Sequence, residues 1–291
     1  MMKKMLWFCV AICPAIIMLL AAKPATVVRR YISIQDAVDA GSIKLKIHGN
    51  GRGYSGYCID MEISNSLHDS GYYLLESGRR LDSKDSNTQD ILVVKENHIP
   101  LAAGEKKHIS IFGFCCQLHH HAPKDTSTYS VGNMADPSLV MLAKFLDGSQ
   151  YPISPMQHAI WVLSDNNQLA SVTPDKDEDI NDLIDMLAKI KNIEVPWYRI
   201  YYDKADTAHV FSGNHNRVTG KLSYFLSNNG VVNISIYTTK GQFVKTIKEG
   251  AANPDTYTYP MALDVRGWSK GQYLVRVTQD DKRILEKKFE L

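Results

Sequence analysis

Cysteine and histidine side chains lie close together in one stretch of the sequence. Two residues separate Cys116 from three consecutive histidines, His119 to His121. Thiolate and imidazole groups at such spacing suit zinc or copper. However, consecutive residues of a strand point to opposite faces, and the Cys-x-x-His pair lacks the second half of a structural zinc site. We therefore expect a polar loop and no cofactor, with Cys116, His119 and His121 as the weak candidates for metal ligands.

The same cysteine could instead act as a nucleophile. Cys116 with His119 or His158 would form a dyad, oriented by Asp165 or Asn166. No spacing in the sequence fixes this geometry. We therefore assign no catalytic residue and keep an exported hydrolase with a Cys/His site as an alternative function.

The N-terminus has the parts of a secretory signal peptide. Lys3 and Lys4 precede an almost wholly apolar run from Leu6 to Leu20, and two alanines follow it. The run is shorter than the ~20 residues that a membrane span needs. We therefore expect residues 1–22 to be a signal peptide, and no transmembrane segment after its removal.

Removal of the signal also changes the charge balance. It takes Lys3 and Lys4 from the 33 basic residues and leaves 31, which equals the 31 acidic residues. The remaining basic residues are scattered along the chain. A nearly neutral chain of this kind is not steered to nucleic acid.

Three cysteines remain in the exported chain, namely Cys58, Cys115 and Cys116. The export route is oxidising, so one disulfide and one leftover thiol are expected. A bridge between the adjacent Cys115 and Cys116 would be strained. Cys58 with Cys115 or with Cys116 is therefore the expected pair.

The first half of the chain predicts an α+β domain over residues 26–202. Residues 31–40 predict a short helix, and five alternating or apolar runs then predict the strands of a β-sandwich-like sheet: Ile43–Ile47, Tyr57–Ser64, Tyr72–Leu75, Gln89–Lys95 and His108–Cys116. Helical periodicity follows over three further segments: Ser138–Leu146, Pro155–Leu163 and Asp177–Ile190.

The last part of the chain predicts an all-β domain over residues 218–291, joined through a polar linker at 203–217. Residues 194–202 fit either a linker or the first strand of this C-terminal domain. Six alternating runs separated by short turns indicate an Ig-like sandwich: Lys221–Leu226, Val231–Tyr237, Gln242–Lys248, Thr256–Met261, Gly271–Thr278 and Arg283–Leu291.

Three segments of this tail carry a resemblance. They are Val232-Asn-Ile-Ser-Ile-Tyr-Thr-Thr-Lys-Gly-Gln-Phe-Val-Lys-Thr-Ile, then Gly271-Gln-Tyr-Leu-Val-Arg-Val, then Lys287-Lys-Phe-Glu-Leu. In this order and spacing they resemble the C-terminal sorting domain of type IX secretion cargo, and also the related Ig-like domain of flagellar hook-capping proteins. The resemblance implies contact with the secretion machinery, passage through the outer membrane, and a secreted or cell-surface protein.

A second resemblance concerns Gln157-His-Ala-Ile-Trp. This segment resembles the Gln-x-Ala-Ile-Trp helix of bacterial surface thioester domains, although Met156 stands where threonine is usual. In that family a cysteine thiol and this glutamine condense with loss of ammonia into an acyl group that captures a partner. Cys115, Cys116 and Cys58 are the candidate thiols, the last within Tyr57-Cys-Ile-Asp. Alternatively, Gln157 only makes a local hydrogen bond.

These features favour binding over catalysis, because no nucleophile, base and orienting group can be recognised together. We expect an exported binding or adhesion protein whose tail sorts it. Its ligand would be a surface protein or a glycan. A structural surface component is the remaining alternative.

Overall fold

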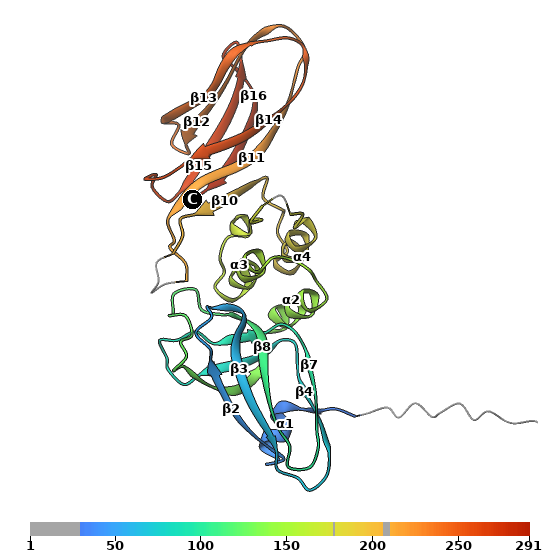
Figure 1. The fold of residues 1–291 in the computed structure, drawn as a ribbon. Coiled ribbons are helices and arrows are strands. Elements are labelled where there is room, and N and C mark those ends of the chain that lie inside the picture. Colours follow the sequence, from blue (N-terminus) through green and yellow to red (C-terminus); the bar gives the residue numbers. More distant parts are fainter. Residues whose placement is uncertain (1–29, 177, 206–209) are drawn as a thin grey trace, which may run out of the picture. The chain divides into compact units, whose positions relative to one another are not determined.

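The computed structural model describes residues 30–176, 178–205 and 210–291. The predicted signal peptide, residues 1–22, lies outside these described residues. The described chain is mostly β, with several sheets and four α-helices, so the predicted α+β class with a following β-sandwich is confirmed (Figure 1). In the described residues, no helix is both long and apolar enough to cross a membrane.

The central sheet closes into a six-stranded barrel. Going round it, the order is β2 (Ile43–Gly49), β3 (Ser55–Asn65), β8 (Lys106–Cys115), β6 (Ile91–Val93), β5 (Arg79–Ser83) and β9 (Thr128–Met134). Inward side chains of these strands, among them Met61, Leu81 and Ile111, form the core. Tyr73 and Leu75 add to this core from a three-stranded sheet of β1 (Ile32–Ser33), β4 (Gly71–Leu75) and β7 (Asn97–Leu101).

The barrel closes through strands that the sequence did not predict. β5 and β9 are mostly polar, and β9 alternates over only its first four residues, Thr-Tyr-Ser-Val. Arg79 is nevertheless only 6% exposed. Its guanidinium pairs with Glu76 at 2.6 Å and donates to the main-chain O of Gly132 at 3.1 Å. Paired and hydrogen-bonded in this way, an arginine is tolerated in the interior.

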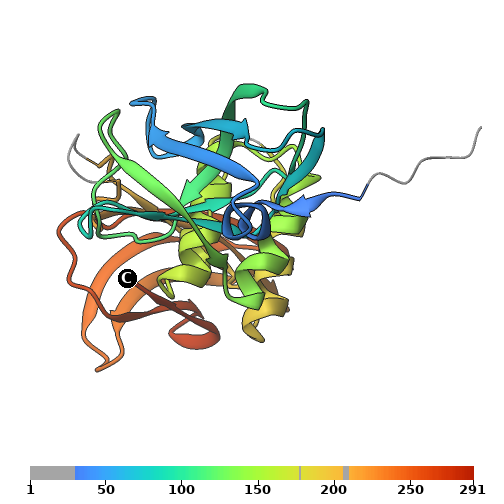
Figure 2. The same cartoon turned by 90° about the horizontal axis from the view of Figure 1, so that it is seen from below.

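Four helices accompany the barrel. α1 (Ile34–Asp39) is shorter than the predicted 31–40, because residues 32–33 form β1 instead. α2 (Pro137–Asp147), α3 (Ile153–Ser164) and α4 (Asn181–Lys191) lie beside one another (Figures 1 and 2), with the short 3-10 helix η1 (Leu169–Ser171) between α3 and α4 in the chain. Asp136 caps α2 by accepting from the N–H of Ser138 at 2.9 Å.

The C-terminal part is a sandwich of two antiparallel sheets. One contains β10 (Tyr198–Tyr202), β11 (His215–Leu226) and β14 (Asp255–Asp264). The other has the order β13 (Phe243–Ala252), β12 (Gly230–Thr238), β15 (Gln272–Gln279) and β16 (Lys282–Glu290). Their inner faces share one core, which includes Leu222, Ile234, Val275 and Phe289. The apolar residues of the alternating runs point inward from both sheets and form this core.

Strand β10 changes the expected boundary at residue 202. It pairs with β11 from Tyr198↔Gly220 to Tyr202↔His215, so it lies in the sheet of the sandwich. Trp197 Nε1 donates to the O of Lys288 at 2.7 Å, which satisfies one main-chain group of β16. Residues 198–202 therefore belong to the C-terminal fold and not to the end of the central domain. The other predicted boundaries stay predictions.

Candidate functional site

The carboxamide of Gln157 is held at one edge of strand β8. Its Oε1 accepts from the N–H of Cys115 at 3.1 Å, and its Nε2 donates to the O of Cys115 at 2.8 Å. The pairing of β3 with β8 ends at Ser55↔Phe114, so no residue of β3 faces Cys115. The glutamine side chain therefore takes the place of the next peptide group of β3. It is 1% exposed.

Helix α3 positions this carboxamide because it contacts both β3 and β8. Ile153 and Gln157 are one turn apart and share a face of the helix. Gly56 of β3, at φ +76°, lies under Ile153, and a Cβ there would meet Ile153 Cδ1 at 3.3 Å. The positive φ of Gly56 disfavours any residue with a side chain, and the close approach of Ile153 adds to this preference for glycine.

Cys58 lies on the same edge of β8, where it contacts Gly113, two residues before the Cys115 that the glutamine bonds. The β3–β8 register shifts between Tyr57 and Ile59, which places Cys58 in a bulge. Its Sγ lies 3.7 Å from the O of Gly113. Main-chain groups of alternate residues face the same edge of a strand, so Gly113 and Cys115 both face β3. The structure thus brings Cys58 and Gln157 to one edge.

The other two cysteines point to different cores. Cys115 is wholly buried in the barrel core with Cys58, whereas Cys116 packs in the core formed with the helices. All three are free thiols in the structure, so the expected disulfide is not formed here and stays a prediction. Burial raises the pKa of Cys58 to about 12 and that of Cys116 to about 12, and it raises the pKa of Cys115 as well. The three thiols are therefore protonated at neutral pH.

The contacts of His158 do not involve a cysteine in the described chain. His158 Nδ1 donates to the main-chain O of Ser171 at 2.8 Å, and the ring stacks on Trp161 with centroids 5.5 Å apart. Asp165 accepts from the N–H of Leu118 at 2.9 Å. These bonds favour structural roles for both side chains, and the dyad with Cys116 stays a prediction.

The neutral form of His158 should make stability depend on pH. Burial lowers its pKa below the usual 6.5, so the unfolded chain binds the proton first as the pH falls. Stability is then fully present above about pH 6.5 and is lost as the pH falls below it. We expect His158→Asn, whose amide can still donate to Ser171, to lose less stability between pH 7.5 and pH 5 in urea titrations. His119→Asn, at an exposed position, is the matched control; an equal pH dependence in all three proteins would refute this role.

The weak metal candidates are not brought together. Cys116 is buried, whereas His119 and His121 are exposed. In the residues that the structure describes, no three His, Cys, Asp or Glu side chains are grouped so as to hold a metal ion.

A polar network that the sequence did not single out lies beside β6. Asp90 pairs with Arg80 at 2.9 Å and accepts from Gln117 Nε2 at 2.6 Å. Gln89, 0% exposed, donates to the O of His120 at 3.0 Å and accepts from the N–H of Gln117. The network fixes the chain after Cys116. In the sequence, the only indication of this network is the polar pair Gln89-Asp90 directly before the apolar run of β6.

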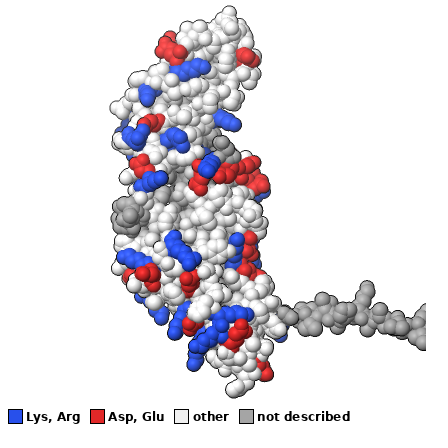
Figure 3. Space-filling view, viewed as in Figure 1, with Lys and Arg blue, Asp and Glu red and all other residues white. Residues whose placement is uncertain are grey.

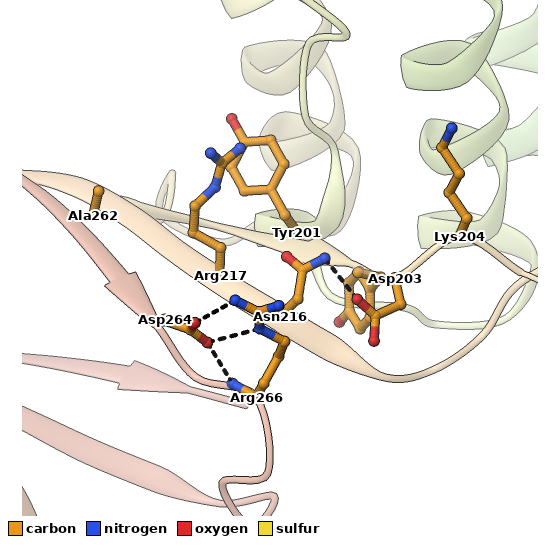
Figure 4. Close-up of a pocket in the computed structure, with 9 residues that line it drawn as sticks. Tyr201, Asp203, Lys204, Asn216, Arg217, Ala262, Asp264 and Arg266 are labelled. Atoms are coloured by element: carbon orange, nitrogen blue, oxygen red, sulfur yellow. Dashed lines mark hydrogen bonds and ion pairs between the residues drawn. The ribbon is translucent and has the colours of Figure 1, made fainter.

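The sandwich carries a polar cleft of about 700 Å³ between β10, β11 and β14 (Figure 4). Four of its charged side chains are held by neighbours, and Lys204 at its edge is exposed. Arg266 bonds Asp264, Asn216 donates to Asp203 at 3.0 Å, and the guanidinium of Arg217 lies 4.2 Å from the centre of the Tyr201 ring. The Asp264 pKa is lowered to about 2 by these hydrogen bonds from Arg266. These contacts hold Arg266, Asp203 and Arg217 in place along the cleft.

The end of the chain is part of the sandwich. Leu291 exchanges two main-chain hydrogen bonds with Gly271, and its side chain is buried. Residues 216–289 match the model of a family described as "Secretion system C-terminal sorting domain". Residues 216–289 are a type IX secretion sorting domain.

The sorting domain fixes the destination of the protein. It implies contact with the type IX secretion machinery, export, and a cell-surface or secreted location. The predicted resemblance of the tail is thus confirmed for type IX cargo. The comparisons give no support to the hook-capping or the thioester resemblance.

No curated protein matches the chain. Among solved structures, the chain has 10% identity to a red sea bream transglutaminase, over 88% of this chain and 32% of that one, at a TM-score of 0.19. It has 10% identity to DesR, a β-glucosidase from Streptomyces venezuelae in complex with D-glucose, over 87% and 48%, at a TM-score of 0.19. The chain spans about a third and about half of their lengths. Likenesses this weak carry no argument about fold or function.

Proposed function

We propose that the sorting domain delivers a surface-binding protein, and that the barrel and its helices capture a surface protein or glycan at Cys58 and Gln157. The observation that carries this proposal is that a buried thiol and a buried carboxamide contact main-chain groups of alternate residues, Gly113 and Cys115, on one edge of β8. A carboxamide is a weak electrophile until its nitrogen leaves. The chemistry that this pair offers is therefore acyl transfer within the protein, followed by transfer to a partner.

The reaction is balanced by the groups present. The Cys58 sulfur adds to the Gln157 carbonyl carbon, the C–N bond breaks, and the thiol proton leaves with the nitrogen as ammonia. A partner amine then attacks the same carbon and the C–S bond breaks. The products are an amide that joins the partner to Gln157 and a restored Cys58 thiol.

The burial of Cys58 and Gln157 limits when the thiol can react. A thiol whose pKa is about 12 is a poor nucleophile in the closed site. The same burial keeps water away from an acyl group once it has formed. The proposal therefore requires movement of α3 relative to the end of β3, where Ile153 rests on Gly56.

An amine probe tests this proposal. The purified chain is incubated with biotin-linked pentylamine, and the labelled residue is located by mass spectrometry. We expect label on residue 157 in the wild-type chain and in Cys116→Ala, and none in Cys58→Ala. Cys116 is the matched control because its side chain packs in the other core. An unlabelled wild-type chain, or labelling that survives Cys58→Ala, would reject capture by this pair.

A further inference from the structure

The barrel is closed by a seam of only two residue pairs. β2 and β9 pair at Ile47↔Tyr129 and His48↔Thr128. Beyond them, β2 from residue 43 to 46 pairs only with β3, and β9 from residue 130 to 134 pairs only with β5, in the part of the chain that the structure describes. The two strands therefore part along most of the length of β2.

Main-chain groups of both strands face this opening. Across the seam, Gly49 N–H donates to the O of Ser127 at 2.9 Å. Because alternate residues of a strand direct their main-chain groups to the same edge, Leu45 and Val131 face the seam as well. An unpaired edge of this kind is a template for another strand.

The opening is a groove with an apolar floor. It has a volume of about 620 Å³ and is lined mainly by strands β2 and β9, with further residues from α1, β3, β8 and the position just after β5. Val38, Leu45 and Val131 are half-buried and pack against the barrel core from within it. Their exposed parts would be covered by the side chains of a strand laid between β2 and β9.

The rim of the groove is basic. Four exposed lysines line it, and Glu62 is the one acidic residue among the described residues that do so. Of the four lysines, Lys46 lies 3.7 Å from that carboxylate, which His108 also approaches to 3.6 Å. The four lysines are Lys44, Lys46, Lys84 and Lys106. Figure 3 shows basic side chains gathered, with a few acidic ones, over the lower part of the molecule, where Figure 1 places β2.

We propose that this seam binds an extended acidic peptide of a partner protein as an added strand. The main-chain groups of Leu45 and Val131 would pair with the peptide, which is the recurring mode of strand addition. Alternate side chains of a strand point to opposite faces, so apolar ones would meet the floor and acidic ones the lysines. The site is separate from Cys58 and Gln157, so it holds whether or not capture occurs there.

A synthetic peptide of alternating valine and glutamate tests this proposal on the full chain. We expect it to bind and to slow hydrogen exchange at the amides of Leu45 and Val131. Reversing two rim charges in Lys44→Glu/Lys84→Glu should weaken binding about tenfold. Lys144→Glu, on the exposed face of α2, should leave binding unchanged.

Three results would overturn the proposal. The first is binding that leaves the exchange of the Leu45 and Val131 amides unchanged. The second is equal binding of a peptide that alternates valine and lysine. The third is that, with no peptide present, protection of these amides increases with protein concentration. Such a result identifies a second copy of this chain as the occupant of the groove.

Discussion

Deleting residues 216–291 is expected to leave the protein in the periplasm. The deletion removes the type IX sorting domain and leaves the barrel core intact, because every residue of that core precedes residue 132. The deletion keeps residues 1–22, and the signal peptide predicted there is expected to carry the chain across the first membrane. The measurement is the distribution of the protein between periplasm, cell surface and medium, by fractionation and surface labelling.

Two phenylalanine substitutions test whether display requires the folded core of the sorting domain. One residue is buried and the other is exposed. Phe289 is 1% exposed and stacks on Tyr273 with centroids 5.5 Å apart. Truncating a buried phenylalanine costs about 3–5 kcal/mol, so Phe289→Ala should destabilise the sandwich and reduce surface display. Phe225 is 66% exposed. Phe225→Ala should change stability by no more than about 0.5 kcal/mol and leave display unchanged.

Undiminished display of the deleted chain would contradict this role of the tail. Display that is lost equally in Phe225→Ala and Phe289→Ala would show that the folded core is not what the machinery requires.

The second large effect is expected at Gln157. Gln157→Ala leaves the N–H and C=O of Cys115 buried without their partner. Each unsatisfied buried group costs about 1–3 kcal/mol, so we expect a loss of about 2–6 kcal/mol in the free energy of unfolding. Urea titration measures it in the Cys58→Ala chain, where the carboxamide of Gln157 stays intact.

Gln242→Ala is the matched control, because Gln242 is exposed and bonds Thr238 through its main chain, which the substitution keeps. It should change stability by no more than about 0.5 kcal/mol. A similarly small effect at Gln157 would mean that water or a shift of β3 satisfies Cys115 without the glutamine, and the geometry argued for this site would be wrong.

Local patterns predicted much of this fold. Alternation places Ile43, Ile47, Met61 and Ile63 on one face of their strands, and these residues lie in the barrel core. The tail was predicted in the same way. In each case the side-chain pattern and the burial it produces are properties of one short segment.

The elements that the sequence missed or left open depend on distant partners. β5 is Arg-Arg-Leu-Asp-Ser, and it is a strand because Glu76 and Gly132 satisfy the inward Arg79. β10 could equally be a linker by sequence, and its pairing with β11 decides its place. Neither partner is visible in the segment itself.

The candidate site was predicted in part. The sequence placed Gln157 near the start of a helix and the cysteines on strands. It could not show that β3 stops pairing at Phe114, which is the reason that the carboxamide bonds the main chain of Cys115. Nor could it show the bulge that places Cys58 on the same edge as Gln157.

The intact mass of the exported chain tests capture at this site most directly. We predict a mass lower than that of the sequence by one ammonia, which methylamine converts to the mass of the methylamine adduct at residue 157. Cys58→Ala should have its full mass and ignore methylamine. A wild-type chain of full mass that does not react with methylamine would contradict covalent capture by Cys58 and Gln157.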